Sequence, residues 1–443
     1  MTETQSSNDI STRLRRIAEL ARRRSGEALT TLAHHIDVDF LRKAYQRVRK
    51  DGAVGVDGQT ADEYGEDLEA NLRSLLDRFK TGRYRAPAVR RVEISKGNGK
   101  TRAIGIPTVE DKVLQRAVTM VLTEVYEQEF LPCSFGFRPG RSAHQALQTF
   151  WQEAMDMHGG WVLEVDIEGF FDSLDHAHLR RFLDRRVRDG VLRRTIDKWL
   201  KAGVLVEGQL QRPKGGTPQG GVISPLLANL YLHVVLDAWM EREVLPRLRG
   251  RAVLIRYADD FVILFAREDD ARRVQAVLPR RLGKYGLRLH AEKTRLVPFG
   301  RPRSGAVEPQ TFTFLGFTLY WGKSRKGAWV VKRKTSKESV RRGLRRVSDW
   351  LRAHCHWPIA VQHQRLLKML RGHYNYFGVT GNANALNHYR HAVMKLWYRR
   401  LNRRTHRGRM TWSRYLRLIT LRFRLPNPTV VHSIYRRVAN PRT

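Results

Sequence analysis

The sequence predicts an α+β chain that ends in an all-helical, strongly basic segment. Two observations support this class. Between residues 37 and 322, short apolar runs bounded by Gly, Pro and Asp are mixed with helical patterns, without the regular βαβ alternation of parallel-sheet proteins. After residue 322, apolar residues recur at helical spacing among arginines. With 443 residues, 42% of them hydrophobic, the chain can bury a large core, and we expect two or three domains.

The N-terminal part is predicted to be mainly helical. Residues 1–36 are polar and Arg-rich, with a helical stretch near residues 12–24, and we expect a basic arm. A helical pattern then extends to about residue 90, interrupted by a glycine-rich turn at 52–58, and leads into a Lys/Gly loop at 95–101. Because the start has no apolar signal core and no run approaches the ~18 to 20 apolar residues of a membrane span, we expect an intracellular, cytoplasmic protein.

Four short apolar runs are predicted to be strands of the central region. They are bounded by Gly, Pro or Asp, and they span residues 161–165, 253–257, 261–265 and 312–320. The second and third runs meet at a turn with two adjacent acids, so we expect a hairpin there.

The last third is predicted to be a helical bundle over residues 323–410, followed by a short basic extension over 411–443. Three apolar stripes follow helical spacing. They are Val340, Leu344, Val347 and Leu351; Leu366, Leu367, Leu370, Tyr374 and Phe377; and Leu386, Tyr389, Val393, Trp397 and Leu401.

The charge is strongly asymmetric along the chain. There are 82 Lys plus Arg against 43 Asp plus Glu, a net charge of +39. Residues 323–443 hold 30 of the basic residues and only two acids, Glu338 and Asp349. Since self-repulsion opposes the folding of such a segment, we favour a nucleic-acid partner, with an acidic membrane surface as the weaker alternative. Cys133 and Cys355 are far apart and predict neither a disulfide framework nor a Cys-rich zinc site.

Acidic residues stand at the ends of the predicted central strands. Asp166 follows the run 161–165, and Tyr257-Ala258-Asp259-Asp260 joins the two strands of the hairpin. Adjacent acids in a turn are often turn chemistry alone. Carboxylates at the ends of two neighbouring strands can, however, converge on Mg²⁺, which takes one or two carboxylates plus substrate phosphates. Two such ions about 3.5 to 4 Å apart promote in-line phosphoryl transfer, as in polymerases and nucleases.

Ordered sequence blocks resemble reverse transcriptases of the group II intron type. The resemblance rests on Asp166 with Phe171, on 257–260, and on the Gly-Thr-Pro-Gln-Gly-Gly segment that begins the block 216–229. Further blocks follow in the order of that family, at residues 55–58, 102–107, 134–142, 286–294 and 314–317. The resemblance covers residue 40 to the end. It implies a right-hand polymerase, with fingers and an antiparallel palm over 37–322 and a thumb or maturase bundle over 323–410.

The resemblance implies roles at the catalytic centre. Asp166, Asp259 and the carbonyl of Ile167 would hold two Mg²⁺ ions, with Mn²⁺ as a substitute, and Asp260 would support the site. Lys293 is the candidate proton donor to the leaving pyrophosphate, although a lone lysine is usually only solvated.

Nucleotide-binding residues are implied as well. Phe171 would exclude the 2′-hydroxyl of a ribonucleotide, the alternative being a core phenylalanine. Gln219 would approach the nucleotide from a glycine-flanked loop, where it is otherwise an ordinary loop residue. Lys96 and Arg102 would bind the triphosphate, the lysine through its ammonium charge and the arginine through its forked guanidinium. The alternative, which is commoner for such a loop, is a solvated basic hairpin.

Nucleic-acid contacts are expected on loops and on the basic helices. Arg138 and Arg141 would hold template phosphates, with a hydrated surface loop as the alternative. Phe314, Leu315 and Gly316 would grip the primer, with a turn packed on the core as the alternative. Arginine interleaved with Tyr and Trp suits structured RNA through phosphate contacts and stacking. The candidates for this role are Arg371, Lys395, Arg399, Arg400, Arg403 and Arg404.

The expected function is RNA-directed DNA synthesis, together with binding of intron RNA that assists splicing and mobility. The partners would be intron RNA, a DNA primer or target and deoxynucleoside triphosphates, with use at the nucleoid and no membrane. The endonuclease domain that the family often adds is not expected, because its Cys and His ligands are missing. Two alternatives stay open: an RNA-binding splicing cofactor with an idle polymerase site, and a related enzyme recruited to another task such as antiviral defence.

Overall fold

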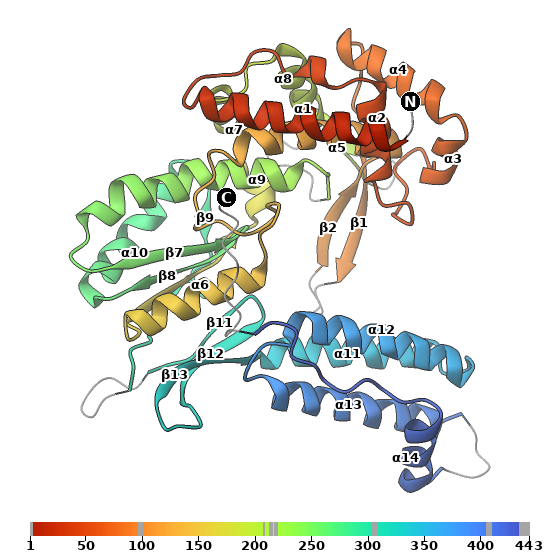
Figure 1. Cartoon of the computed structure of the whole chain (residues 1–443), viewed down its shortest axis with the longest axis vertical. Helices are drawn as coiled ribbons and strands as arrows, with labels where there is room; N and C mark the ends of the chain where they lie inside the picture. The colour runs from red at the N-terminus through yellow and green to blue at the C-terminus, as the bar shows by residue number, and fades with distance from the viewer. Residues whose placement is uncertain are drawn as a thin grey trace. The chain divides into compact units, whose positions relative to one another are not determined.

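The computed structural model describes residues 3–95, 101–206, 209–211, 216, 220–302, 309–404 and 410–433 (Figure 1). The chain divides into two compact units. Unit 1 comprises residues 1–146 and 163–296, and unit 2 comprises 147–162 and 297–443. The sequence predicts a boundary near residue 322, whereas the structure assigns the strands after residue 311 to unit 2. The physical reason is packing, because Phe317 lies against the rings of Tyr376 and Phe377 in a C-terminal helix.

Unit 1 is rich in helices, and its first helix is packed rather than extended as an arm. Its helices are α1 (Glu3–Arg23), α2 (Val38–Gln46), α3 (Ala61–Glu66), α4 (Leu68–Lys80), α5 (Val109–Tyr126), α7 (His176–Asp184), α8 (Gly190–Lys201), α9 (Ser224–Leu232) and α10 (Glu268–Gly283). Ile10, Ile17 and Ala21 are buried, and α1 lies along α5. The apolar residues of this segment are sparse, so the sequence pattern suggests an arm although the helix has a buried stripe.

Two residues near the start of α8 hold the end of α1 and the segment that follows it. Arg186 Nη2 donates to the carbonyl of Ala21 over 2.6 Å. The carboxylate of Asp189 accepts hydrogen bonds from the backbone N–H groups of Leu32 (2.7 Å) and Ala33 (2.8 Å). Both side chains are buried, so these bonds fasten the N-terminal segment to unit 1.

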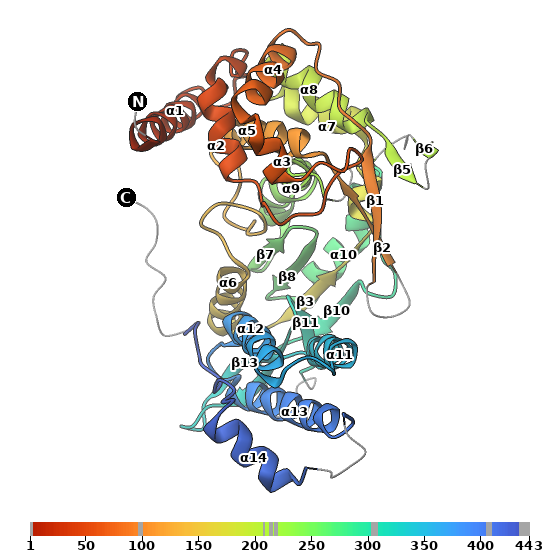
Figure 2. The ribbon, with the colours of Figure 1, turned by 90° about the vertical axis from the view of Figure 1, so that its right-hand side faces the viewer.

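The strands of the first sheet, in the order β2-β1-β5-β6, form the projecting hairpins seen in Figure 2. β1 is antiparallel to β2 and parallel to β5. The bounds are β1 (Val89–Ser95), β2 (Thr101–Ile106), β5 (Val204–Val206) and β6 (Gln209–Gln211).

A second sheet has the order β10-β3-β8-β7, and β7 and β8 form an antiparallel hairpin. Its strands are β3 (Trp161–Val165), β7 (Ala252–Tyr257), β8 (Asp260–Phe265) and β10 (Arg295–Pro298). A small pair joins β4 (Ile167–Glu168) to β9 (Arg288–Leu289). The strands predicted at 161–165, 253–257 and 261–265 are therefore confirmed.

Short helical turns connect these elements. They are η1 (Ala33–His35), η2 (Phe170–Ser173), the π-helical turns η3 (His233–Asp237) and η4 (Met240–Val244), and η5 (Leu245–Arg247). The helix α6 (Ala143–Asp156) contains the point at which the chain passes from unit 1 to unit 2.

Unit 2 contains a three-stranded sheet in the order β11-β12-β13. Its strands are β11 (Phe312–Phe314), β12 (Phe317–Lys323) and β13 (Trp329–Thr335). The sequence predicts a single strand over 312–320, but Leu315 and Gly316 have φ angles of 50° and 78° and form a tight turn. Two consecutive residues with positive φ are the feature of a two-residue hairpin loop, and this explains the break.

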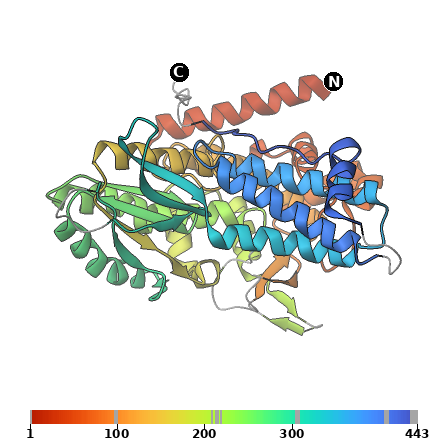
Figure 3. The ribbon, with the colours of Figure 1, turned by 90° about the horizontal axis from the view of Figure 1, so that it is seen from below.

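The helices of unit 2 form a bundle, as predicted, but its bounds differ from 323–410. Residues 329–335 are a strand paired with β12, and the helix Trp412–Leu421, inside the predicted extension, adds Tyr415 and Ile419 to the core. The helices are α11 (Lys337–Ala353), α12 (Ile359–Phe377), α13 (Ala383–Leu401) and α14 (Trp412–Leu421), and the blue helices of Figure 3 run side by side. The three predicted stripes are confirmed, because their members supply most of a single buried core. No helix in the described part of the chain has the length and apolar character of a membrane span.

Candidate active site

Two carboxylates from distant parts of the chain come together at the second sheet. Asp166 directly follows β3, and Asp259 occupies the turn between β7 and β8, whereas Asp260 is the exposed first residue of β8. β3 lies beside β8. Burial raises the pKa of Asp259, and the negative charge of Asp166 raises it further, against a bond from its own backbone N–H and the charges of Arg102 and Arg256. The structure therefore brings both Asp166 and Arg102 within electrostatic reach of Asp259.

A buried arginine fixes the turn that bears Asp259. Arg256 on β7 is fully buried and donates to both carboxylate oxygens of Asp237, at 2.7 and 2.6 Å. Its other donors bond to Asn229 Oδ1 (3.0 Å), Ser134 Oγ (2.8 Å) and the carbonyl of Ala258 (2.9 Å). All five N–H donors of the guanidinium are thus used. The sequence predicts no role for this residue, and its signal there is one charge inside an otherwise apolar run.

The loop 134–142 lies directly against the same turn. A Cβ atom at Gly136 would overlap the backbone nitrogen of Ala258 and come within 3.0 Å of the carbonyl carbon of Tyr257. Asn229 Nδ2 donates to the carbonyl of Gly136 over 2.6 Å. Only glycine permits this approach of two backbones, so the loop and the turn are fixed relative to each other.

Lys293 is placed beside Asp166 by the small β4–β9 pair. The backbone N–H of His290 donates to the carbonyl of Asp166 (2.9 Å), and Lys293 Nζ lies 2.6 Å from Asp166 Oδ2. Ile167 opposes Leu289 in this antiparallel register. Because hydrogen-bonded and non-hydrogen-bonded pairs alternate, the carbonyl of Ile167 points away from β9.

The donor set fits a magnesium ion that shares its coordination with a substrate. Asp166, Asp259 and the carbonyl of Ile167 offer only oxygen ligands, which Mg²⁺ prefers. In the described part of the chain, no three His, Cys, Asp or Glu side chains gather into a metal site by themselves. Magnesium usually keeps several water ligands and binds through one or two carboxylates plus phosphates. A site with two carboxylates agrees with this coordination preference.

Phe171 stands in η2, next to the loop that begins at Gly216. The Phe171 side chain is 8% exposed, and its ring meets that of Phe170 edge to face at 5.4 Å. Gly216 donates its N–H to the carbonyl of Leu174 (2.8 Å), and its own carbonyl bonds to His176 Nε2 (2.5 Å). The start of the loop is therefore anchored close to Phe171.

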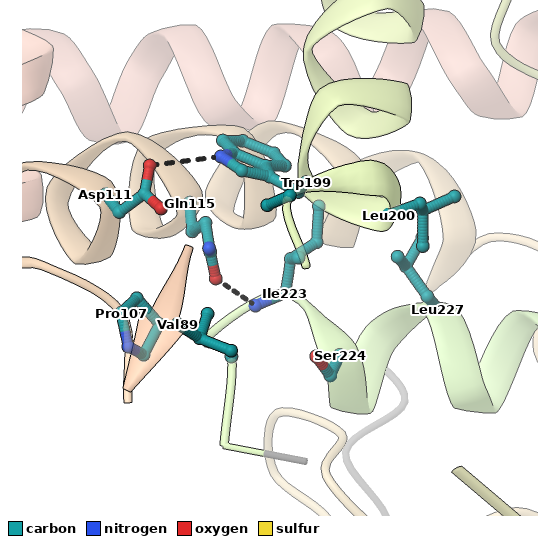
Figure 4. Close-up of a pocket in the computed structure, with 11 residues that line it drawn as sticks. Val89, Pro107, Asp111, Gln115, Trp199, Leu200, Ile223, Ser224 and Leu227 are labelled. Atoms are coloured by element: carbon teal, nitrogen blue, oxygen red, sulfur yellow. Dashed lines mark hydrogen bonds between the residues drawn. The ribbon is translucent and has the colours of Figure 1, made fainter. Parts of the chain in front are cut away.

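The end of that loop is anchored by a glutamine for which the sequence predicts no role. Gln115 on α5 accepts hydrogen bonds from the N–H groups of Val222 (2.8 Å) and Ile223 (3.4 Å) through Oε1. Figure 4 shows this side chain pointing from α5 to Ile223, in a small pocket that Gly221 and Ile223 also line. Gln219 and Lys96, both predicted to bind the nucleotide, lie outside the described residues.

Arg138 is a correction to the predicted template contacts. Its side chain is 4% exposed and makes a forked ion pair with Glu127, with Nη2 to Oε2 at 2.9 Å. Nη1 donates to the carbonyls of Leu131 (2.8 Å) and Ser134 (2.9 Å). A guanidinium engaged in this way fixes the loop and is not available to a phosphate. Arg141 is exposed, with its guanidinium 5.6 Å from the ring centre of Phe135.

The predicted primer-gripping turn belongs to unit 2 and is held by α12 and the start of α11. Tyr376 Oη donates to the carbonyl of Leu315 (2.9 Å), and the N–H of Ser336 donates to the carbonyl of Gly316 (2.9 Å). Phe314 is 1% exposed, so its side chain packs in the core and only Leu315 and Gly316 present the turn.

The basic residues predicted to bind RNA lie on α12, on α13 and just after it. Arg371, Lys395, Arg399, Arg403 and Arg404 are exposed, and Arg400 is half-buried. Arg404 also donates to the carbonyl of Trp357. No carboxylate follows Asp349 in the sequence, so acidic side chains from this segment cannot neutralise these charges.

Comparison with known proteins agrees with this geometry. The family described as "Reverse transcriptase (RNA-dependent DNA polymerase)" matches residues 94–319. The group II intron-encoded protein LtrA of Lactococcus lactis subsp. cremoris is 29% identical over 85% of this chain and 75% of its own length. Protein YkfC of Escherichia coli (strain K12) is 33% identical over 65% of this chain and 81% of its own length. The chain therefore belongs to the reverse transcriptases, RNA-dependent DNA polymerases, and to their group II intron-encoded branch.

Proposed function

We propose that this chain extends a DNA primer along an RNA template and also binds intron RNA to assist splicing and mobility. The adjacency of β3 and β8, which brings Asp166 to Asp259, is the observation that supports polymerase chemistry most directly. In this proposal residues 37–322 contain the fingers and palm of a right hand. Residues 323–410 form the thumb or maturase bundle, and 411–443 a short basic extension.

The chemistry assigned to the site is an in-line displacement at phosphorus. The primer O3′ forms a bond to the α-phosphorus of the deoxynucleotide, the bond to the β-phosphate oxygen breaks, and pyrophosphate leaves. Two Mg²⁺ ions, or Mn²⁺, held by Asp166, Asp259 and the Ile167 carbonyl would lower the pKa of the attacking hydroxyl and stabilise the leaving oxygen. Arg102 attracts the triphosphate, and Lys293, 2.6 Å from Asp166, donates a proton to the pyrophosphate.

Selection of the incoming nucleotide is assigned to the residues around η2. Phe171 closes the space beneath the sugar, so a 2′-hydroxyl would collide with its ring. Gln219 approaches the nucleotide from a loop that is anchored at Gly216 and at Ile223. Lys96 adds a second cation to the triphosphate, and Asp260 supports the acidic pair.

Nucleic-acid binding is assigned to exposed cations and to one turn. Arg141 contacts template phosphates, and Leu315 with Gly316 contacts the primer. The exposed cations of α12 and α13 bind intron RNA, an assignment supported by the absence of carboxylates after Asp349. A further relative, the nuclear intron maturase 2 of Arabidopsis thaliana mitochondria, is 30% identical over 40% of this chain and 31% of its own length.

Replacing one catalytic acid tests the polymerase function and separates it from RNA binding. Asp259→Ala removes one of the two carboxylates, and we expect complementary-DNA synthesis to fall below detection in a primer-extension assay. RNA affinity and splicing assistance should stay near wild type, because the mutation lies in unit 1 and the basic helices lie in unit 2. Full extension by Asp259→Ala would overturn the assignment, and loss of both activities would contradict their separation.

A further inference from the structure

Phe137 exposes an aromatic ring beside the catalytic turn. Its side chain is 57% exposed, and no other phenylalanine among the described residues is as exposed. The ring centre lies 6.4 Å from that of Tyr257, with the planes tilted by 40°. Tyr257 pairs with Asp260 across the β7–β8 turn. A solvent-facing phenyl ring is thus held at the edge of the acidic site.

The backbone at Phe137 is strained. Its φ of 57° lies in the left-handed region, which bulky side chains rarely adopt. Both neighbours are fixed, because Gly136 bonds to Asn229 and packs on the turn, while Arg138 is buried in its ion pair with Glu127. A glycine at 137 would adopt this conformation without strain. Neither burial nor backbone preference accounts for a phenylalanine here, and residues held in this way cluster at ligand-binding sites.

We propose that Phe137 contacts the substrate of DNA synthesis by stacking its ring on a nucleobase of the primer–template duplex next to Asp259. The inference rests on the proposed polymerase function. An aromatic ring suits any base, because every base has a π face, and stacking of this kind is tolerant of sequence. Arg141, exposed in the same loop, supplies the cation that a neighbouring phosphate requires.

Single-nucleotide incorporation measures the effect of losing the ring. The assay uses an RNA template, a DNA primer, deoxynucleotides and Mg²⁺, under single-turnover conditions. Phe137→Ala should lower the incorporation rate or the duplex affinity by roughly 5- to 150-fold, the range found when one base–aromatic stack is lost. Phe137→Tyr and Phe137→Trp keep a ring and should restore most of the activity, whereas Phe137→Leu should not. Val277→Ala, at a 45% exposed position on α10, is the matched control and should behave as wild type.

Abasic substrates identify the base that is contacted. One duplex lacks the base of the primer terminus, and another lacks the templating base. If the ring stacks on the base that is missing, Phe137→Ala should not lower the incorporation rate or the affinity any further on that duplex, because the mutation and the abasic site then remove the same interaction. Cancellation on either duplex supports the proposal and assigns the strand. An undiminished effect of Phe137→Ala on both duplexes would overturn it, as would a Phe137→Ala variant that equals wild type on the intact duplex.

A binding measurement separates this inference from the polymerase function. The measurement is made with Asp259→Ala protein, because binding is followed without any chemical step. The fluorescent base 2-aminopurine replaces the base at the primer terminus or the templating base. Phe137→Ala should raise the fluorescence of the bound probe in one of these positions, since stacking quenches it. Unchanged fluorescence at both positions would refute the stacking, even where wild-type extension is normal. If the fluorescence changes but the wild-type protein itself extends no primer, the polymerase function alone is refuted.

Discussion

A single buried charge organises the turn that bears Asp259. Arg256 and Asp237 form an ion pair that is removed from water, an arrangement that is stable only when every donor and acceptor is satisfied. The remaining donors of Arg256 reach Asn229, Ser134 and the carbonyl of Ala258. Ala258 has a φ of 58°, so the turn that bears Asp259 is itself strained and needs such support. Asp237 lies in the π-helical turn η3, and π turns are often found at functional sites.

Sugar selection can be tested at Phe171. Phe171→Ala removes the ring proposed to lie beneath the sugar, so we expect ribonucleotides to be incorporated at a rate closer to that of deoxynucleotides. The ratio of kcat/KM for the two substrates, measured with the same template, reports the effect. Because truncating a buried Phe costs about 3–5 kcal/mol of stability, Phe170→Ala is the matched control for packing. Equal sugar discrimination in wild type and Phe171→Ala would remove Phe171 from this role.

Asp111 predicts a dependence of stability on pH. Burial raises its pKa from 3.8 to about 7, and this outweighs the hydrogen bond from Trp199 Nε1. The folded state binds this proton more tightly than the unfolded state, so the free energy of unfolding should fall as pH rises from about 4 to 7, by roughly 4 kcal/mol at most. Chemical denaturation across that range measures the slope. Asp111→Asn should flatten it relative to wild type, and parallel curves for the two proteins would contradict the argument.

At the scale of elements, the loop 216–223, proposed above to bind the nucleotide, is fastened at both ends. Gly216 is bonded to Leu174 and His176, and Val222 and Ile223 are bonded to Gln115. Anchors of this kind reduce the entropy that the loop loses when a substrate binds.

Removing the second anchor should weaken nucleotide binding selectively. Gln115→Leu leaves two N–H groups without their acceptor, which costs about 1–3 kcal/mol for each group that stays buried. We expect the KM for deoxynucleotides to rise several-fold, with the affinity for primer–template unchanged. Steady-state kinetics with each substrate varied in turn will show this. A rise in both constants would mean that the substitution disturbs the whole of unit 1.

Elements were predicted from the sequence where periodicity is strong. The stripes of α11 to α13 and the strands β3, β7 and β8 follow directly from the spacing of apolar residues. The break in 312–320 was not predicted, because Leu315 is a residue that rarely takes positive φ. The structural roles of Arg256, Gln115 and Arg138 are also not predicted from the sequence. The role of a buried polar side chain depends on its hydrogen-bond partners, and these come from distant segments of the chain.

At the scale of the whole molecule, the charge distribution predicts how RNA is bound. The segment 323–443 has 30 basic and two acidic residues, so its binding energy should come mainly from phosphate contacts. For roughly 6 such contacts, affinity should fall on the order of a thousandfold between about 50 and 200 mM salt. Filter binding or anisotropy with intron RNA at several salt concentrations measures the slope.

Charge-removing variants assign that slope to residues. Arg399→Ala and Arg403→Ala, both at exposed positions, should each lower the slope by about 1. Arg73→Ala is the matched control, because Arg73 is 71% exposed but lies in unit 1 and is paired with Glu69. A flat salt response in the wild type would exclude phosphate-dominated binding.

The bonds from Arg186 to the last turn of α1 and from Asp189 to the segment after it set an order of events during synthesis. The first helix leaves the ribosome well before either of these residues has been translated. At that stage neither α5 nor the bonds from Arg186 and Asp189 are present to hold and cover its apolar stripe. Until α8 emerges, the side chains of Ile10, Ile17 and Ala21 must stay exposed to solvent or be bound by a chaperone. Replacing Arg186 or Asp189 should therefore lower the yield of native protein during expression more than it lowers the activity of the molecules that do fold.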